Sequence, residues 1–316
     1  MVPKNSKQRA ETAVLDLNAK LRQLNNELTS KGVTIAVNAP LVDTIKAVAM
    51  MKVVREEVPM TLFKDTQFYQ WEDATLPAMK LKDGVTVSLR YTFSEMTSLT
   101  ELPEIAGLER TNNISFMCKS NSSLRFAALP DLPKCTDATE AFSYCASIET
   151  IAVGNMPTCT SFYCFALSSN AVKTISIGDA PMAGNINSVA YDCPALEEFT
   201  ANFGGKINNA RYAFYSCRNL RRINGVLDFS TVTDFTYTFF ACSSLEEVRI
   251  KNLKVSLDLS SCANLSLDSV SYLINNAQAV LGYTITLNSS IADKYDEDIV
   301  TIGDKATEKG WTINYR

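Results

Sequence analysis

Cysteine is the residue type in this chain with the greatest capacity for chemistry, through metal binding, cross-linking or nucleophilic attack. The sequence contains nine cysteines and no histidine. Without histidine, neither a Ser-His-Asp nor a Cys-His arrangement can form, and the commonest metal ligand is missing. No Cys-x-x-Cys pair occurs either, whereas zinc needs four ligands that converge on one point. We therefore predict no catalytic cysteine, no metal site and no cofactor.

Adjacent carboxylates are the second group of residues with catalytic potential. Glu197–Glu198 and Glu246–Glu247 are the clearest pairs, and paired acids cleave glycosides when their carboxyl groups face each other at about 5–9 Å. Both pairs instead recur at one position of a sequence repeat, which is typical of a solvated strand edge. No glycine-rich phosphate loop or nucleophile elbow is present. We predict that the protein is not an enzyme.

These residues belong to a repeat of about 24 residues that extends from roughly Thr86 to Leu265, and a repeat of this length indicates a solenoid. The successive units begin at residues 93, 118, 142, 166, 190, 214, 239 and 259. One apolar column consists of Leu99, Leu124, Ile148, Val172, Leu196, Leu220, Leu245 and Leu265. A second column lies upstream of it, at Leu89, Ile114, Ala138, Phe162, Ile186, Ala210, Phe235 and Val255. One coil cannot bury these edges alone, but stacked coils share a core.

Five cysteines occupy one repeat position, namely Cys145, Cys193, Cys217, Cys242 and Cys262. A buried thiol packs like a small apolar side chain, so we expect a ladder of buried thiols. Neighbouring rungs would also satisfy the Cα separation of about 4.4–6.8 Å that a disulfide needs, which leaves a cross-link open. Asn121 and Ser169 replace the cysteine in two units, and we expect these coils to pack less closely.

The repeat motif resembles the BspA-like leucine-rich repeat family, whose units read AF-x-x-C-x-x-L-x-x-I. The segments AFSYCASIETI from Ala141 and AFYSCRNLRRI from Ala213 carry the resemblance most clearly. Such repeats occur in phage tail or virion proteins and in bacterial surface proteins. The fold expected is a solenoid of about eight ~24-residue leucine-rich-repeat-like β coils, with an N-terminal helical segment and a small α/β C-terminal cap.

Four segments are expected along the chain: an N-terminal helix over 1–32, a small α/β linker and N-terminal cap over 33–83, the solenoid over 84–268, and a C-terminal α/β cap over 269–316. The N-terminal helix has apolar residues at steps of 4 and 3, which is typical of a coiled-coil seam. It would either dock on its own chain or associate with further copies, and we favour a homo-oligomer, most plausibly a trimer. The residues of the seam are Val14, Leu17, Leu21, Leu24 and Leu28.

The C-terminal cap is expected to contain helices over about 267–279 and 292–309 and strands over 283–287 and 311–315. Gly310 is a suitable residue to end the second helix. The closing segment ATEKGWTI, residues 306–313, resembles the ends of phage-encoded and bacterial surface proteins with such repeats.

Composition and charge limit the classes of partner. The net charge of −4 argues against sequence-independent binding to phosphate backbones, so we expect no nucleic acid. No apolar run approaches the roughly 20 residues that span a bilayer, so we expect no membrane insertion. The segment MVPKNSKQRAETAV has no apolar signal-peptide region. This favours a virion protein that assembles in the host cytoplasm over the alternative, a bacterial cell-surface adhesin that must be exported.

The predicted function is binding through the outward positions of the short strands. These positions form a continuous face along the coils, and solenoids use such faces to bind partners. We expect a host-surface receptor, protein or glycan, on the repeats, and other virion proteins on the N-terminal region. The candidate partner-binding residues are Glu198, Thr200, Arg222, Asn224, Glu247 and Arg249. Repeated tyrosines and phenylalanines, at Tyr91, Phe116, Tyr212 and Tyr237, either stack on a ligand or form the second wall of the coils, and we favour the wall.

Overall fold

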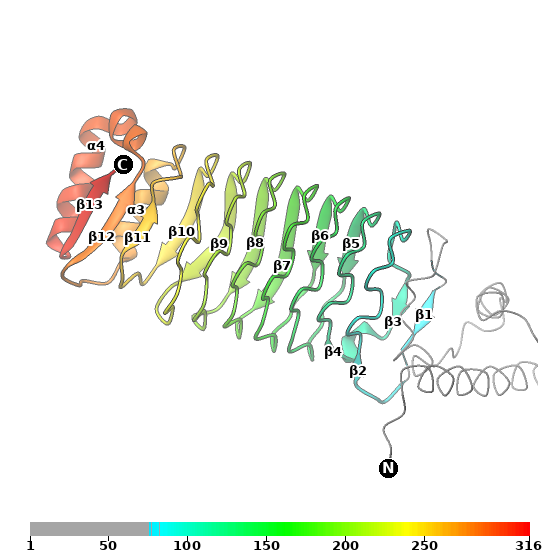
Figure 1. The fold of residues 1–316 in the computed structure, drawn as a ribbon. Coiled ribbons are helices and arrows are strands. Elements are labelled where there is room, and N and C mark those ends of the chain that lie inside the picture. The colour runs from blue at the N-terminus through cyan, green and yellow to red at the C-terminus, as the bar shows by residue number, and fades with distance from the viewer. Residues whose placement is uncertain (1–75, 77, 82) are drawn as a thin grey trace, which may run out of the picture. The chain divides into compact units, whose positions relative to one another are not determined.

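The computed structural model describes residues 76, 78–81 and 83–316, which all belong to the second of the two units, 1–58 and 59–316, into which the chain divides. The predicted N-terminal helix with its seam of Val14, Leu17, Leu21, Leu24 and Leu28 lies outside the described residues, as does nearly all of the predicted segment 33–83. From residue 83 onward the chain winds in successive coils, each stacked on the one before (Figure 1). The predicted solenoid is confirmed.

One parallel sheet runs along the solenoid, and each coil contributes one strand. Its order is β5, β6, β7, β8, β9, β10. Neighbouring strands place equivalent repeat positions side by side, so that Ile151 pairs with Ile175 and Phe199 with Ile223. The bounds of these strands are β5 Phe126–Leu129, β6 Thr150–Val153, β7 Thr174–Ala180, β8 Glu198–Phe203, β9 Arg222–Asp228 and β10 Glu247–Lys251.

Shorter parallel pairs precede this sheet. The strand β1 (Met79–Lys80) pairs with β3 (Ile105–Ala106), and β2 (Val87–Ser88) pairs with β4 (Thr111–Asn113). A short 3-10 helix, η2 (Leu108–Arg110), lies between β3 and β4. Parallel pairing therefore begins before residue 84, the boundary expected from the repeat.

A second ladder of single parallel bridges stacks the turns on the other side of each coil. It joins Asn113, Asp137, Ser161, Asn185, Asn209 and Asp234. In each coil the side-chain oxygen of this residue accepts a hydrogen bond from the backbone N–H two residues later; Asp137 Oδ1, for example, lies 2.9 Å from Thr139 N. Asp, Asn and Ser are favoured here because their short side chains reach their own backbone.

The predicted apolar columns form the core. Every member of the column from Leu99 to Leu265 is buried, as is the upstream column from Leu89 to Ala210. The upstream column is wrong at its end, because Phe235 and Val255 are only half-buried. Val255 was assigned by the shortened step of 20 residues, but a step of 24 residues from Phe235 leads to Leu259, which is buried.

The cysteine ladder is also confirmed, and all nine cysteines are buried and free. Each ladder thiol donates to a carbonyl of the preceding coil: Cys217 Sγ lies 2.9 Å from Ala190 O, and Cys242 Sγ lies 2.9 Å from Phe214 O. Where Ser169 replaces cysteine, its hydroxyl donates to Phe142 O at 2.7 Å in the same way and accepts from Cys145 N at 3.1 Å. The serine thus maintains the contact between coils.

Each coil except the last turns through two non-glycine residues in the left-handed region, four positions apart. This conformation costs about 1–2 kcal/mol per residue. Backbone hydrogen bonds between successive turns offset the cost: Tyr212 N, Phe214 N and Ser216 N donate to carbonyls of the next coil at 2.8–2.9 Å. The pairs are Tyr91/Glu95, Phe116/Ser120, Glu140/Tyr144, Cys164/Ser168, Ser188/Asp192, Tyr212/Ser216 and Tyr237/Ala241.

Beyond the last repeat, helices cover a small parallel sheet of order β11, β12, β13 (Figure 1). The strand β11 (Leu257–Leu259) belongs to the shortened coil and pairs with β12 (Tyr283–Leu287), which pairs with β13 (Trp311–Tyr315). Ser266 begins α3 (Leu267–Asn276) as an N-cap, since its Oγ accepts from Ser269 N. Asn288 does the same for α4 (Ser289–Glu308). The secondary structure predicted for this region is thus present.

Candidate binding face

The outward positions of the main sheet form the predicted continuous face. Phe126 and Thr150 are exposed on β5 and β6, and Glu247 is exposed on β10. Of the candidate partner-binding residues, Asn224, Glu247 and Arg249 are exposed, whereas Glu198, Thr200 and Arg222 are partly covered. All six lie on the three adjacent strands β8, β9 and β10.

These side chains contact one another across the coils. Arg222 lies between two glutamates, with NH1 3.7 Å from Glu198 Oε1 and Nε 3.2 Å from Glu247 Oε1. Asn224 Nδ2 donates to Thr200 Oγ1 at 3.1 Å. Exposed ion pairs contribute little to stability in water. A partner that binds here can therefore replace them with contacts of its own at a small cost in free energy.

Arg249 departs from the predicted register. The repeat placed Arg249 beside Asn224, but Arg249 pairs with Val226, because the ladder shifts between Glu247 and Arg249. The cause is a bulge at Gly225, whose φ of 110° is one that side-chain-bearing residues rarely adopt. The guanidinium of Arg249 consequently lies over the ring of Tyr272 on α3, 5.7 Å from its centroid.

A row of alternating charges, which the sequence analysis did not identify, runs beside this face. The row consists of Arg125, Glu149, Lys173, Glu197, Arg221 and Glu246, each at the repeat position just before a strand. Glu149 is 3.2 Å from both Arg125 and Lys173, and these hydrogen bonds, first that of Arg125, lower the pKa of Glu149. Alignment of the position one residue before each outward position would have revealed the alternation.

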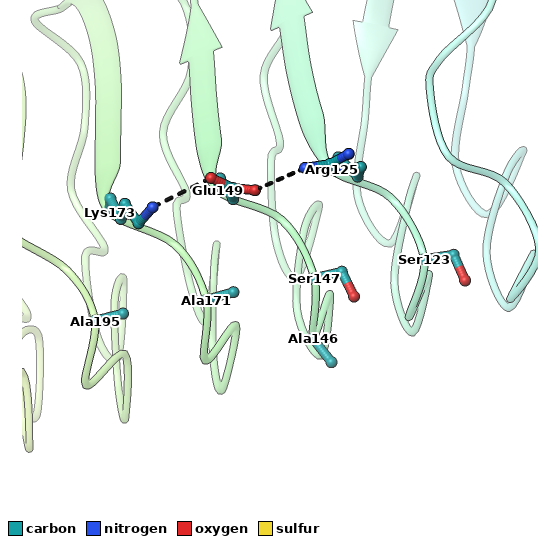
Figure 2. A pocket seen from close by; sticks show the side chains of 8 residues that line it. All are labelled: Ser123, Arg125, Ala146, Ser147, Glu149, Ala171, Lys173 and Ala195. Atoms are coloured by element: carbon teal, nitrogen blue, oxygen red, sulfur yellow. Dashed lines mark hydrogen bonds and ion pairs between the residues drawn. The ribbon is translucent and has the colours of Figure 1, made fainter.

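A shallow trough of about 660 Å³ lies beneath the first part of this row (Figure 2). Figure 2 shows Arg125, Glu149 and Lys173 joined in a line at the start of the strands, with small side chains on the turns below. These small side chains belong to Ser123, Ala146, Ser147, Ala171 and Ala195. The charged side chains of the trough, Arg125 and Lys173 against Glu149, leave it with a net charge of +1.

The acid pair Glu246–Glu247 is held in ion pairs, and the described cysteines are buried. Glu246 accepts two hydrogen bonds from Arg221, both at 3.1 Å, so the acid pair Glu246–Glu247 is held in ion pairs by Arg221 and Arg222. Burial raises the pKa of the Cys145, Cys193 and Cys262 thiols to about 12, so they remain protonated at neutral pH. Among residues 83–316, no three His, Cys, Asp or Glu side chains are placed to hold a metal ion.

No helix in the described part of the chain is long and apolar enough to cross a membrane.

In comparisons with known families, the family described as BspA type leucine rich repeat region matches this chain in six copies, over residues 60–171, 138–225 and 186–285. The curated proteins gave no significant match. The solved structures gave none either.

Proposed function

Since the chain belongs to the family of BspA type leucine-rich repeats, we propose that it is a non-enzymatic binding protein of a phage virion. It would be part of a tail fibre or related appendage, and its repeat region would bind the host surface. The observation that carries the binding role is the outward face of the sheet, which continues without interruption from β5 to β10. Residues 306–313 resemble the ends of phage-encoded and of bacterial surface proteins with such repeats, so the virion has to be distinguished from the bacterial surface by experiment.

The receptor would lie on β8, β9 and β10, where charged and amide side chains gather. Arg222 forms ion pairs with Glu198 and Glu247, and Asn224 donates to Thr200. Binding spread over many shallow positions resists single substitutions, unlike an interface that depends on a few central residues. Binding of the receptor, whether protein or glycan, should therefore be lost only when several of these residues are substituted together.

Competition for host cells tests this proposal. Purified full-length protein should block adsorption of the phage, and a variant with alanine at Glu198, Arg222, Asn224, Glu247 and Arg249 should not. The matched control carries alanine at Asp293, Lys294, Asp304 and Lys305, a charge-balanced set on α4. It should compete as the wild type does. If the wild-type protein neither binds cells nor competes, the solenoid is not the receptor-binding part.

The N-terminal segment would attach the protein to other virion proteins and join copies of the chain, with a trimer favoured. Light scattering on the full chain and on a Leu17→Asp/Leu24→Asp variant tests the self-association. The wild type should scatter as an oligomer and the variant as a monomer, because a charge in an apolar seam is costly to bury. A wild-type monomer at micromolar concentration would contradict it.

The alternative function is that of a bacterial cell-surface adhesin with the same repeats. Electron microscopy with an antibody against the chain distinguishes the two locations. Label on phage particles supports the virion, and label on uninfected cells supports the adhesin.

A further inference from the structure

The aromatic side chains on the turns form two stacked columns that end at the last full coil. In one column Tyr191, Tyr215 and Phe240 are stacked with centroids 4.8 and 5.1 Å apart and planes within 13°. In the other, Tyr212 and Tyr237 are stacked at 5.6 Å. Tyr237 and Phe240 are the last rings and meet edge to face at 5.7 Å. They remain 54% and 45% exposed, respectively.

The columns end because the next coil lacks the turn that would carry another ring. The units that begin at residues 239 and 259 are separated by 20 residues instead of about 24. The left-handed pair Tyr237/Ala241 has no counterpart among residues 253–262. The turn after β11 is shortened, since Cys262 follows Leu259 by three residues whereas Cys242 follows Phe235 by seven, and this leaves the position of the next aromatic ring open.

A pocket of about 460 Å³ occupies this open position, which is within the range of about 300–1,000 Å³ typical of small-ligand sites. The rings of Tyr237 and Phe240 line one part of it, and polar residues of the shortened coil line the rest, notably Ser256, Asp258 and Ser261. Asp234 lies on the side of the full coil. The site therefore combines apolar ring surfaces with oxygen atoms that can accept hydrogen bonds.

The polar groups are fixed in place by the backbone. Asp234 Oδ1 accepts from Thr236 N at 3.0 Å and Asp258 Oδ1 accepts from Ser260 N at 2.9 Å. Among residues 83–316, the second oxygen of each carboxylate has no hydrogen-bond partner. Ser256 Oγ accepts from Thr284 N at 2.9 Å, which leaves its own hydrogen free to donate. A ligand here would meet acceptors and a donor in defined positions.

The other exposed ring stack, Tyr91 on Phe116, differs because cations already cover it. The Arg90 guanidinium lies 5.0 Å from the Tyr91 centroid, and Lys119 Nζ lies 5.3 Å from that of Phe116. No cation of the described residues lies over Tyr237 or Phe240. The pocket is lined by two carboxylates and by no lysine or arginine, so it disfavours anionic ligands.

We propose that this pocket is a binding site for a neutral sugar residue, which would take the place of the missing ring in the stack. The C–H face of a pyranose is apolar and flat enough to pack on Tyr237 or Phe240. Its hydroxyl groups would donate to Asp234 and Asp258, and hydrogen bonds to a charged acceptor are the stronger kind. The site is separate from the sheet face of the proposed function, and the inference does not depend on it.

Titration of the full-length protein with neutral tetrasaccharides of glucose, galactose, mannose and N-acetylglucosamine, followed by NMR or calorimetry, tests the proposal. The wild type should bind at least one of them with a Kd of about 10 mM or tighter. Tyr237→Ala/Phe240→Ala should weaken that binding about tenfold or more, because an aromatic contact contributes a factor of roughly 2–12 beyond its buried area. Asp258→Asn, which keeps an oxygen for the turn, should weaken it by a smaller factor.

The matched control is Tyr91→Ala/Phe116→Ala, which removes an exposed stack of the same kind at the other end of the solenoid. Circular dichroism should show every variant folded, and the control should bind the saccharide as the wild type does. The proposal is overturned if no tetrasaccharide binds the wild type. It is equally overturned if the folded Tyr237→Ala/Phe240→Ala variant binds undiminished, or if the control loses binding to the same extent.

Discussion

Substitution of two glycines by alanine should change stability in opposite directions, because the two positions differ in backbone conformation and in space. Gly225 forms the bulge of β9 with a φ of 110°, and a Cβ added there would lie 2.1 Å from Ala201 O on β8. Gly303 lies within α4, and a Cβ added there would meet nothing within 4 Å.

The size of each effect follows from these contacts. A non-glycine residue held in such a conformation costs about 1–3 kcal/mol, and a methyl group forced against backbone costs about 1–3 kcal/mol more. Gly225→Ala should therefore lower the free energy of unfolding by about 2–6 kcal/mol. Gly303→Ala should raise it by about 0.5–1 kcal/mol, because alanine has the higher helix propensity.

Urea unfolding followed by circular dichroism measures both changes. Repeat arrays can unfold in more than one step, so the midpoint of each transition should be compared with that of the wild type. The reasoning is refuted if Gly225→Ala unfolds at the wild-type midpoint, since the bulge that places Arg249 opposite Val226 could not then require glycine. Gly303→Ala is the control for the substitution itself.

Three further predictions test the core, the thiols and one carboxylate. Leu220→Ala should lower the free energy of unfolding by about 2–5 kcal/mol as a truncation in the core, whereas Arg222→Ala should change it by no more than about 0.5 kcal/mol. Equal losses in urea unfolding would show that the inward and outward positions are misassigned. A thiol reagent should label Cys145, Cys193, Cys217 and Cys242 only after denaturation. Fast labelling of these cysteines in the native protein, measured by mass spectrometry, would exclude a buried ladder. Burial alone would raise the pKa of Asp228, but hydrogen bonds from Asn252, Ser230 and Lys251 outweigh it and lower that pKa to about 2. The Asp228 carboxylate therefore contributes about 2 kcal/mol to the free energy of unfolding above pH 4, and this contribution is lost as the pH falls toward 2. In urea unfolding at pH 7, the wild type should be more stable than Asp228→Asn by this amount. A difference that persists at pH 2 would refute the prediction.

The sequence by itself was sufficient for the solenoid, its buried columns and the cysteine ladder. Each coil contacts only its neighbours, so equivalent residues meet the same environment, and a residue such as Leu220 or Cys217 is constrained to one type. The periodicity of the sequence is therefore a direct record of the packing. The helices and strands after Leu265 could be predicted for a more local reason, since caps and apolar spacing act within a few residues.

The tertiary structure decided the features that depend on contacts between particular coils. The left-handed turns have no glycine signal, because backbone hydrogen bonds to the next coil, such as that from Ser216 N to Phe240 O, maintain them. The position of Arg249 depends on a bulge in the neighbouring strand, which moves the register beyond the repeat. The pocket beside Tyr237 and Phe240 exists only because the following coil omits part of a turn. A repeat pattern describes the positions that the coils share, so it does not predict what lies where a coil lacks one of these positions.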